Sequence, residues 1–296
     1  MKNRQTEFEA LRPYLTGLAF RMLGSRADAE DAVQDCWLRL MQASSEPDNI
    51  KAWLTRVCTN ICLDSLRRLK RERERYEGPW LPDPIRETEK ADESYSDPAE
   101  LAETLQQSYL LLLERLTPGE RASLILHDVF GFSFEEVGNI LKVTAATARQ
   151  HASRARKHLK ASKTRFDAST EDLEMLGGRL YAAVAHGDID GIVDHLANDV
   201  ELWTDGGGKA LAARNIIYGA TNVAAFLSGV IRKMDTGFEV EAGVLNGKPA
   251  VYVRTNDGSF DTLSTFSCNT DGYINRIFVH RNPDKLSAFP HEVALV

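Results

Sequence analysis

The spacing of apolar residues changes after residue 166, and no other feature limits the possible folds as strongly. Before that point apolar side chains return every three or four residues, as Leu11 and Leu15 do, which is the spacing of one helix face. After it, β-branched residues come in short runs that turn residues such as Asn246 and Gly247 separate. The sequence therefore predicts an all-α first half followed by an α+β module.

In the second half, apolar residues at helical spacing predict helices over residues 170–196 and 220–234. Short alternating runs predict strands, and we expect them to pair as a strongly curved antiparallel sheet. Such a sheet would curl around the helices into a cone with a pocket. The five predicted strands cover residues 200–203, 238–245, 250–255, 260–267 and 273–279.

Several local signals place helix starts in the first half. Ser25 precedes a run rich in acidic residues, which suits the positive end of a helix. Thr117 is followed by proline and then by Glu120, and Ser133 is followed three positions later by Glu136. Both spacings are those of a capping box, so they predict helices that start directly after Thr117 and Ser133.

The second of these helices leads into a helix-turn-helix. A short turn at Lys142 separates residues 134–141 from a basic helix over residues 145–160, with Thr144 as its N-cap. A recognition helix reads the major groove with its first exposed residues, and arginine and glutamine can bind bases through two hydrogen bonds. The candidate base contacts are Thr144, Thr147, Arg149, Gln150, Ser153 and Arg154. The alternative is an ordinary basic helical hairpin.

The predicted helix over residues 50–74 is a second candidate DNA surface. It ends in a charge run with many arginines, and polar Thr59, Asn60 and Asp64 lie between its apolar positions, where unpaired base edges could be read. The alternative is a solvated face. By contrast, the helix after Ser25 exposes acidic side chains, which would repel DNA and suit a basic protein partner.

The formal net charge of −7 hides two basic segments. Lysine and arginine exceed the acids by 3 over residues 1–75 and by 5 over residues 105–166. The acids exceed the bases by 7 over residues 76–104 and by 8 over residues 167–296. An acidic, proline-containing linker thus separates two basic blocks, which an acidic module follows.

These features give four segments. They are residues 1–75, a first helical domain; 76–104, an acidic linker; 105–166, the helix-turn-helix domain; and 170–290, the α+β domain. Trp80 and Leu81 are too apolar for a purely solvated linker, so the segment is either a disordered spacer or one that docks onto a domain.

The motifs "DAEDAVQDCWLRL", "KAWLTRVCTNICLDSLRR" and "LTPGERASLILHDVFGFSFEEVGNIL" resemble those of bacterial extracytoplasmic-function (ECF) sigma factors of the sigma-70 family. The resemblance implies promoter-specific transcription initiation with core RNA polymerase, through its β′ clamp helices and β flap. It implies polymerase binding by Asp28, Asp31, Asp35 and Trp37, and contact with the −10 promoter element by Asn60, Asp64, Arg67 and Arg68. It also implies contact with the −35 element by the helix-turn-helix residues named above. Lys142, Gly138 and Ala148 depart from the residues usual in the family at these positions.

Three further motifs, "WLPDP" (80–84), "DGGGK" (205–209) and "NPDKL" (282–286), resemble the subgroup with a fused C-terminal SnoaL-like domain. There the fused domain takes the place of a separate anti-sigma factor, which implies contact between this domain and the sigma domains or the linker. The expected regulatory contacts are Trp80, Leu81, Pro82, Trp203, Asp205, Gly206, Gly207, Gly208, Lys209, Asn282 and Asp284. The glycines do not form a nucleotide-binding P-loop, because Ala210 follows the lysine.

Two other roles for the C-terminal domain stay open: a small-ligand sensor, or an isomerase- or cyclase-like enzyme using Asp205, Asp261, His195 or His280. We expect a regulator and not an enzyme, with no catalytic residues, metal or cofactor. The four cysteines fit buried free thiols better than a metal or redox pair. Without a signal peptide or a long apolar segment, the sequence predicts a cytoplasmic protein that does not enter membranes.

Overall fold

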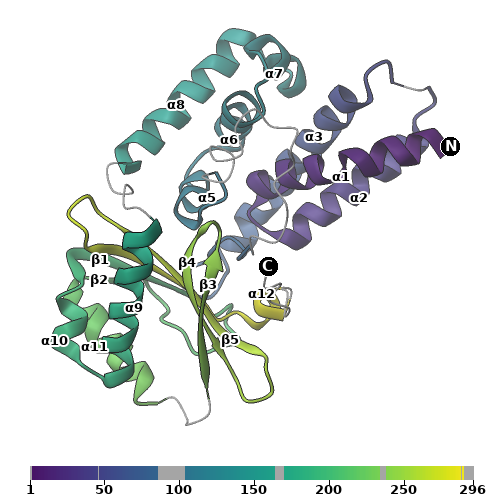
Figure 1. Cartoon of the computed structure of the whole chain (residues 1–296). Helices are drawn as coiled ribbons and strands as arrows, with labels where there is room; N and C mark the ends of the chain where they lie inside the picture. The colour runs from purple at the N-terminus through teal and green to yellow at the C-terminus, as the bar shows by residue number, and fades with distance from the viewer. Residues whose placement is uncertain are drawn as a thin grey trace. The chain divides into compact units, whose positions relative to one another are not determined.

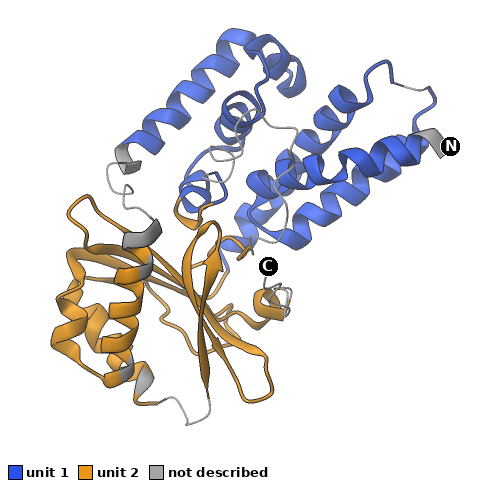
Figure 2. Ribbon diagram, in the orientation of Figure 1, with its two compact units in different colours: residues 1–75, 91–105, 109–161 blue, residues 76–90, 106–108, 162–296 orange. Residues whose placement is uncertain are grey.

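The computed structural model describes residues 2–45, 47–85, 104–163, 170–233, 238–287 and 289. The chain divides into two compact units, which Figure 2 shows in different colours. The helical unit comprises residues 1–75, 91–105 and 109–161, and the C-terminal unit comprises residues 76–90, 106–108 and 162–296. The described first part of the predicted linker, residues 76–85, therefore groups with the C-terminal unit.

Three helices open the helical unit (Figure 1): α1 (Lys2–Leu23), α2 (Arg26–Gln42) and α3 (Ile50–Arg73). The predicted cap at Ser25 is confirmed, because its side chain accepts a hydrogen bond from the Asp28 amide. Apolar side chains of all three helices form the core, among them Phe8, Leu15, Leu18, Leu40, Leu54 and Ile61. Cys36, Cys58 and Cys62 lie buried in the same core as free thiols.

The second part of the helical unit contains α5 (Gln107–Leu113, whose first two residues group with the C-terminal unit), α6 (Pro118–Leu124), the π-helix η1 (Ile125–Val129), α7 (Phe134–Leu141) and α8 (Ala145–Lys163). Both predicted capping boxes are present, at Thr117 and at Ser133. The helix that starts after Thr117 does not continue as an α-helix, because it widens into a π-helix at Ile125. Local start signals therefore fixed where α6 and α7 begin, but not the pitch that packing imposes further along.

The turn between α7 and α8 is tight at two positions. Lys142 takes the left-handed conformation, with φ 57° and ψ 42°, in the place where a glycine would be unstrained. A Cβ at Gly138 would lie 2.8 Å from the carbonyl oxygen of Val143, so only glycine fits there without movement of the turn. In this chain Lys142 stands where the sigma-factor pattern has a glycine in the turn. A glycine is needed instead at Gly138, within α7.

A buried arginine joins the two parts of the helical unit. Arg121 of α6 is 2% exposed, and its guanidinium donates to the carbonyl oxygens of Met22 (2.8 Å) and Leu113 (2.9 Å). Its side chain also pairs with Glu114 at 2.8 Å. Since Met22 lies in the last turn of α1, the cation faces the negative end of that helix and satisfies a carbonyl that has no partner within the helix.

The C-terminal unit places helices α9 (Thr170–His186), α10 (Ile189–Val193) and α11 (Ala220–Ile231) on a six-stranded sheet (Figure 1). Its strands are β1 (Leu196–Asp205), β2 (Ile217–Tyr218), β3 (Glu239–Leu245), β4 (Lys248–Arg254), β5 (Phe260–Cys268) and β6 (Ile274–His280). The short helix α12 (Pro283–Ser287) follows the last strand. The predicted helix over residues 170–196 is in fact two, because Gly187 turns at φ 67° and Asp188 caps α10. Residue 234, the expected end of the third helix, lies outside the described residues.

The sheet is mixed, and the expectation of a purely antiparallel sheet is wrong. The strand order is β2-β1-β6-β5-β4-β3, and β1 runs parallel to β6 while every other pair is antiparallel. The parallel pair joins two strands far apart in sequence, so no turn signal announces it. It sets Asp205 beside His280 at the ends of the two strands. The α+β class of the domain is confirmed. Within the described residues no helix is long and apolar enough to cross a membrane.

Candidate functional site

A buried polar site in the C-terminal unit centres on Asp205, the last residue of β1. Its side chain is fully buried, and a buried carboxylate is stable only when hydrogen-bond donors or cations satisfy it. The Tyr76 hydroxyl donates to one oxygen at 2.5 Å, and the Leu81 amide donates to the other at 3.0 Å. Two donors to this carboxylate thus come from the segment that the sequence predicted as a linker.

Lys285 of α12 supplies the compensating charge. Its ammonium lies 2.9 Å from Asp205 Oδ2 and 3.4 Å from Asp83 Oδ1, and it donates to the Leu81 carbonyl oxygen. The same ammonium lies 4.4 Å from the centroid of the Trp80 ring, a cation–π contact. With only 9% of its side chain exposed, Lys285 binds the linker through charge, hydrogen bond and ring at once.

Tyr76 links this site to the loop before α12. Its hydroxyl accepts a hydrogen bond from the Asn282 amide at 2.8 Å while it donates to Asp205. Burial and the negative charge of Asp205 raise the pKa of Tyr76 well above its usual value, so the hydroxyl keeps its proton. It therefore acts as a fixed donor at neutral pH.

The rest of the segment is held by burial and by backbone pairing. Leu81 is 0% exposed, and Pro82 is also buried. Ile85 and Asn246 exchange two hydrogen bonds: the Asn246 amide donates to the Ile85 carbonyl at 2.9 Å, and the Ile85 amide donates to the Asn246 side chain at 3.2 Å. Gln107 donates to the Pro82 carbonyl at 2.9 Å. We call residues 76–85 in this position the docked linker.

The glycines of the "DGGGK" loop let the docked linker and the loop at Asn282 approach closely. A Cβ at Gly207, where φ is 61°, would lie 2.4 Å from the Asn282 side chain. A Cβ at Gly208, where φ is 69°, would lie 2.9 Å from Glu77. At Gly206 it would lie 2.5 Å from the Ala210 carbonyl oxygen. Gly206 and Gly207 are therefore needed for close packing, and Gly207 and Gly208 for a left-handed backbone.

The remaining predicted regulatory residues lie at the edge of this site or take part in other contacts. Lys209 pairs with Asp284 at 2.5 Å, and both side chains are largely exposed. Trp203 donates its indole N–H to Glu201 at 3.1 Å. Four residues of the site were not predicted from the sequence: Tyr76, Lys285, Asn246 and Gln107. Of these, Lys285 was visible as part of "NPDKL", whereas Asn246 was read only as a turn.

The candidate catalytic residues are dispersed. Asp261 pairs with Arg281 at 2.7 Å, and His195 precedes β1 whereas Asp205 ends it, about ten residues and roughly 30 Å of strand apart. His280 lies beside Asp205, but burial and the charge of Lys285 lower its pKa to about 3. A histidine that stays neutral at such a pKa is a weak base near pH 7.

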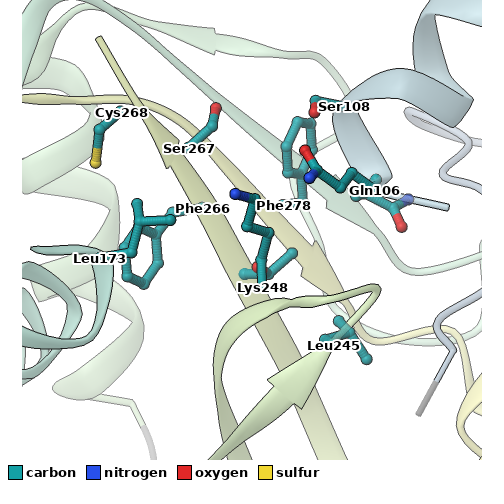
Figure 3. Close-up of a pocket in the computed structure, with 11 residues that line it drawn as sticks. Gln106, Ser108, Leu173, Leu245, Lys248, Phe266, Ser267, Cys268 and Phe278 are labelled. Atoms are coloured by element: carbon teal, nitrogen blue, oxygen red, sulfur yellow. The ribbon is translucent and has the colours of Figure 1, made fainter. Parts of the chain in front are cut away.

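A cavity between the sheet and residues 106–108 is too small for a metabolite (Figure 3). Its volume is about 20 Å³, room for roughly one water molecule. Figure 3 shows Leu173, Phe266 and Phe278 around it, with Lys248 and Gln106 as polar neighbours. This cavity therefore offers a metabolite-sized ligand no space.

In the helical unit, α3 carries the residues predicted to contact the −10 element. Asp64 and Arg67 form an exposed ion pair at 2.6 Å, and Asn60 donates to the Arg56 carbonyl at 2.9 Å. Arg68 pairs with Asp28 of α2 at 3.1 Å, which brings together a predicted DNA contact and a predicted polymerase contact. Thr59, also expected at the base-reading surface, is fully buried, because it faces the core between Cys58 and Cys62.

On α2, Asp31 and Asp35 are exposed as expected. Trp37 is half-buried and packs on Phe8, with ring centroids 5.0 Å apart, so it has a structural contact as well as any role in binding. Leu38, which was not predicted from the sequence, is 48% exposed beside the acids. A single exposed leucine is ordinary on a protein surface, so Leu38 adds apolar area beside the acids but does not by itself mark a binding site.

The helix α8 presents its predicted residues on one side. Thr144 caps the helix, accepting from the Thr147 amide at 3.1 Å, and Arg149, Gln150, Ser153 and Arg154 are exposed. The opposite side is apolar and buried, through Ala148, Ala152, Ala155 and Leu159. The short helix α7, the left-handed turn at Lys142 and the half-exposed helix α8 together define a helix-turn-helix.

These features define a protein with a two-part helical unit, whose second part contains a helix-turn-helix typical of DNA-binding proteins, and a fused α+β domain. Two family models match it, Sigma-70 region 2 over residues 8–72 and Sigma-70 region 4 over residues 106–159. The chain belongs to the ECF sigma factors of the sigma-70 family, and its function is that of an RNA polymerase sigma factor, which implies interaction with RNA polymerase and promoter DNA.

Individual relatives match over different lengths. The ECF RNA polymerase sigma factor SigJ of Mycobacterium tuberculosis is 34% identical over 293 residues, 96% of this chain and 94% of the relative. Its crystal structure matches with a TM-score of 0.74 over 97% of this chain and 99% of that one, at 33% identity. The probable ECF sigma factor SigI of the same organism is 34% identical over 64% of this chain and 65% of its own length. Similarity to SigJ thus includes the C-terminal unit.

Proposed function

We propose that the C-terminal unit regulates the sigma factor by holding the linker between its two DNA-binding modules. The observation that carries this proposal is the convergence of Tyr76, Leu81 and Lys285 on the buried carboxylate of Asp205. A carboxylate with three partners, two of them from the linker, is specific for one position of that segment.

Chain length explains how docking can act on promoter binding. The Gln107–Pro82 hydrogen bond closes a stretch of 25 positions between the two modules. A free chain of that length can reach about 80 Å. The −10 and −35 elements lie about 25 base pairs apart, which is about 85 Å at a rise of about 3.4 Å. We therefore propose that the docked linker shortens the reach between the modules and restrains the sigma factor.

Within the modules we propose the following division of work. Residues Asn60, Asp64, Arg67 and Arg68 contact the −10 element, and the exposed side of α8 contacts the −35 element. On α2, Asp31, Asp35 and the neighbouring Leu38 bind the β′ clamp helices of polymerase, while the helix-turn-helix module binds the β flap. The acidic side chains suit a basic partner surface, and the exposed leucine adds apolar area.

We propose that the C-terminal unit acts without catalysis. Asp205, the acid best placed beside a histidine, is already occupied by the docked linker, and its neighbour His280 is a weak base. The cavity of about 20 Å³ speaks equally against a metabolite sensor at that position.

Transcription with core polymerase tests the proposal. Three chains are compared: full length, one that ends near residue 167, and one that ends near residue 281 and so lacks Lys285. If docking restrains the sigma factor, the chain ending near 281 initiates more often than full-length protein. Unchanged promoter binding and initiation in both truncated chains would show that the C-terminal unit has no regulatory role.

A further inference from the structure

One arginine of the helix-turn-helix rests on an aromatic pair. The imidazole of His127 stacks on the ring of Phe134, with centroids 3.9 Å apart and planes at 23°. The guanidinium carbon of Arg149 lies 5.1 Å from the centroid of the same Phe134 ring. We call His127 and Phe134 the aromatic support of Arg149.

Both rings of the support are fixed by their own backbone surroundings. His127 lies in the π-helix η1, and its Nδ1 is 2.7 Å from the carbonyl oxygen of Phe132. Because a carbonyl oxygen only accepts, this nitrogen carries the proton and the ring has one orientation. Phe134 is the first residue after the Ser133 cap, whose capping box with Glu136 closes at 2.8 and 3.2 Å.

A ring holds a guanidinium without using its hydrogen-bond donors. Arg156, further along α8, shows the contrast: Asp128 binds it at 2.8 and 2.5 Å, which occupies Nε and one terminal nitrogen and neutralises the charge. Arg149 is exposed in the second turn of α8, and stacking on Phe134 leaves its charge and planar fork available. Such a fork can bind the O6 and N7 of guanine through two hydrogen bonds.

We propose that Phe134, backed by His127, is a positioning residue that sets the base preference of Arg149 in the −35 element. The inference rests on the proposed role of α8 as the recognition helix. A free arginine side chain loses several rotamers on binding a base, whereas one already restricted by a ring loses fewer. Removing the ring therefore weakens discrimination between bases at the position that Arg149 reads, and leaves other positions of the element unchanged.

The test uses holoenzyme made from the full chain and core polymerase, with duplex promoter DNA randomised through the −35 element. Bound sequences are counted for the wild type and for Phe134→Leu, Phe134→Tyr, Arg149→Ala and Arg149→Lys. In Arg149→Ala, the preference for one base over the others at a single base pair is expected to fall by about 5- to 150-fold. Phe134→Leu is expected to lose about two- to fivefold at the same base pair, and Phe134→Tyr to keep the preference.

Coupling between the variants separates positioning from folding. In the Arg149→Ala background, Phe134→Leu should change base preference no further, since the two side chains act as one unit. Arg149→Lys keeps the charge but not the planar fork, so it should lose the preference while binding phosphates as before. If Phe134→Leu changes affinity equally for all sequences, the inference is wrong and the −35 role of α8 survives. If wild-type holoenzyme shows no preference anywhere in the element, the proposed role of α8 itself fails.

Discussion

Lys285 Nζ lies 2.9 Å from Asp205 Oδ2, and the two side chains are 9% and 0% exposed. The pair joins the end of β1 to the last described helix, and the docked linker covers it with Tyr76, Trp80 and Leu81. A buried ion pair adds little net stability, but breaking one half leaves an uncompensated charge. The ion pair therefore determines where the linker docks more than it adds to the free energy of unfolding.

Lys285→Met should release the docked linker. The change leaves the carboxylate of Asp205 without its cation, at a cost of about 3–5 kcal/mol. Hydrogen exchange at the Leu81 amide, which donates to Asp205, should rise to the rate of an exposed amide. The matched control is Glu241→Gln, which removes one half of a partly exposed ion pair with Arg254 elsewhere in the same unit. Slow exchange at Leu81 in Lys285→Met would contradict the proposed function of the pair.

Tyr76→Phe should weaken docking by about 1–3 kcal/mol, because it removes the hydroxyl that serves both Asp205 and Asn282. The raised pKa of Tyr76 adds a pH dependence. The folded state keeps this proton where the unfolded chain loses it, so the contribution is complete below pH ~10 and declines as the pH rises further. Urea unfolding of the C-terminal unit at rising pH measures it. Above pH ~10 the free energy of unfolding should fall less steeply with pH in Tyr76→Phe than in the wild type.

Gly207→Ala should disrupt docking far more than an alanine at an equally left-handed glycine in open space. At Gly207 the added Cβ meets Asn282 at 2.4 Å, whereas at Gly258, with φ 81°, it meets no atom within 4 Å. Gly258→Ala therefore reports the backbone cost alone, about 1–2 kcal/mol. Limited proteolysis of the linker compares the two variants. Equal cleavage rates would mean that the close approach at Gly207 does not hold the linker.

Lys142→Gly should stabilise the helix-turn-helix. The lysine backbone has φ 57°, and a glycine there removes a strain of about 1 kcal/mol, although it also gains freedom in the unfolded chain. We expect a net gain below ~1 kcal/mol and a melting temperature a few degrees higher. Calorimetry of the full chain measures this change. A lower melting temperature would show that the Lys142 side chain contributes more than its backbone costs.

The sequence was sufficient for features whose cause is local. Ser25, Thr117 and Ser133 predicted helix starts correctly, because a cap depends on residues within one helical turn. The parallel pairing of β1 with β6 was not predicted, since nothing near either strand specifies a partner some seventy residues away. The buried position of Thr59 was missed for a related reason: a threonine on a helix suits core and surface alike.

The candidate site divides in the same way. "WLPDP", "DGGGK" and "NPDKL" indicated segments that contact one another, and the structure brings Leu81, Asp205 and Asn282 to one site. Neither Tyr76 nor Asn246 was expected there. A tyrosine after a charge run and an asparagine in a turn have ordinary local explanations, and only the tertiary fold sets them against the linker.

The most direct test of the central claim is transcription by holoenzyme containing Asp205→Asn, with linker release followed in the same samples by hydrogen exchange at Leu81. The amide of asparagine loses the ion pair with Lys285 but keeps the size of the side chain. If the docked linker restrains the sigma factor, initiation should rise severalfold over wild type, whereas Glu241→Gln leaves it unchanged. Equal or lower initiation from Asp205→Asn, with the linker shown to be released, would contradict the claim.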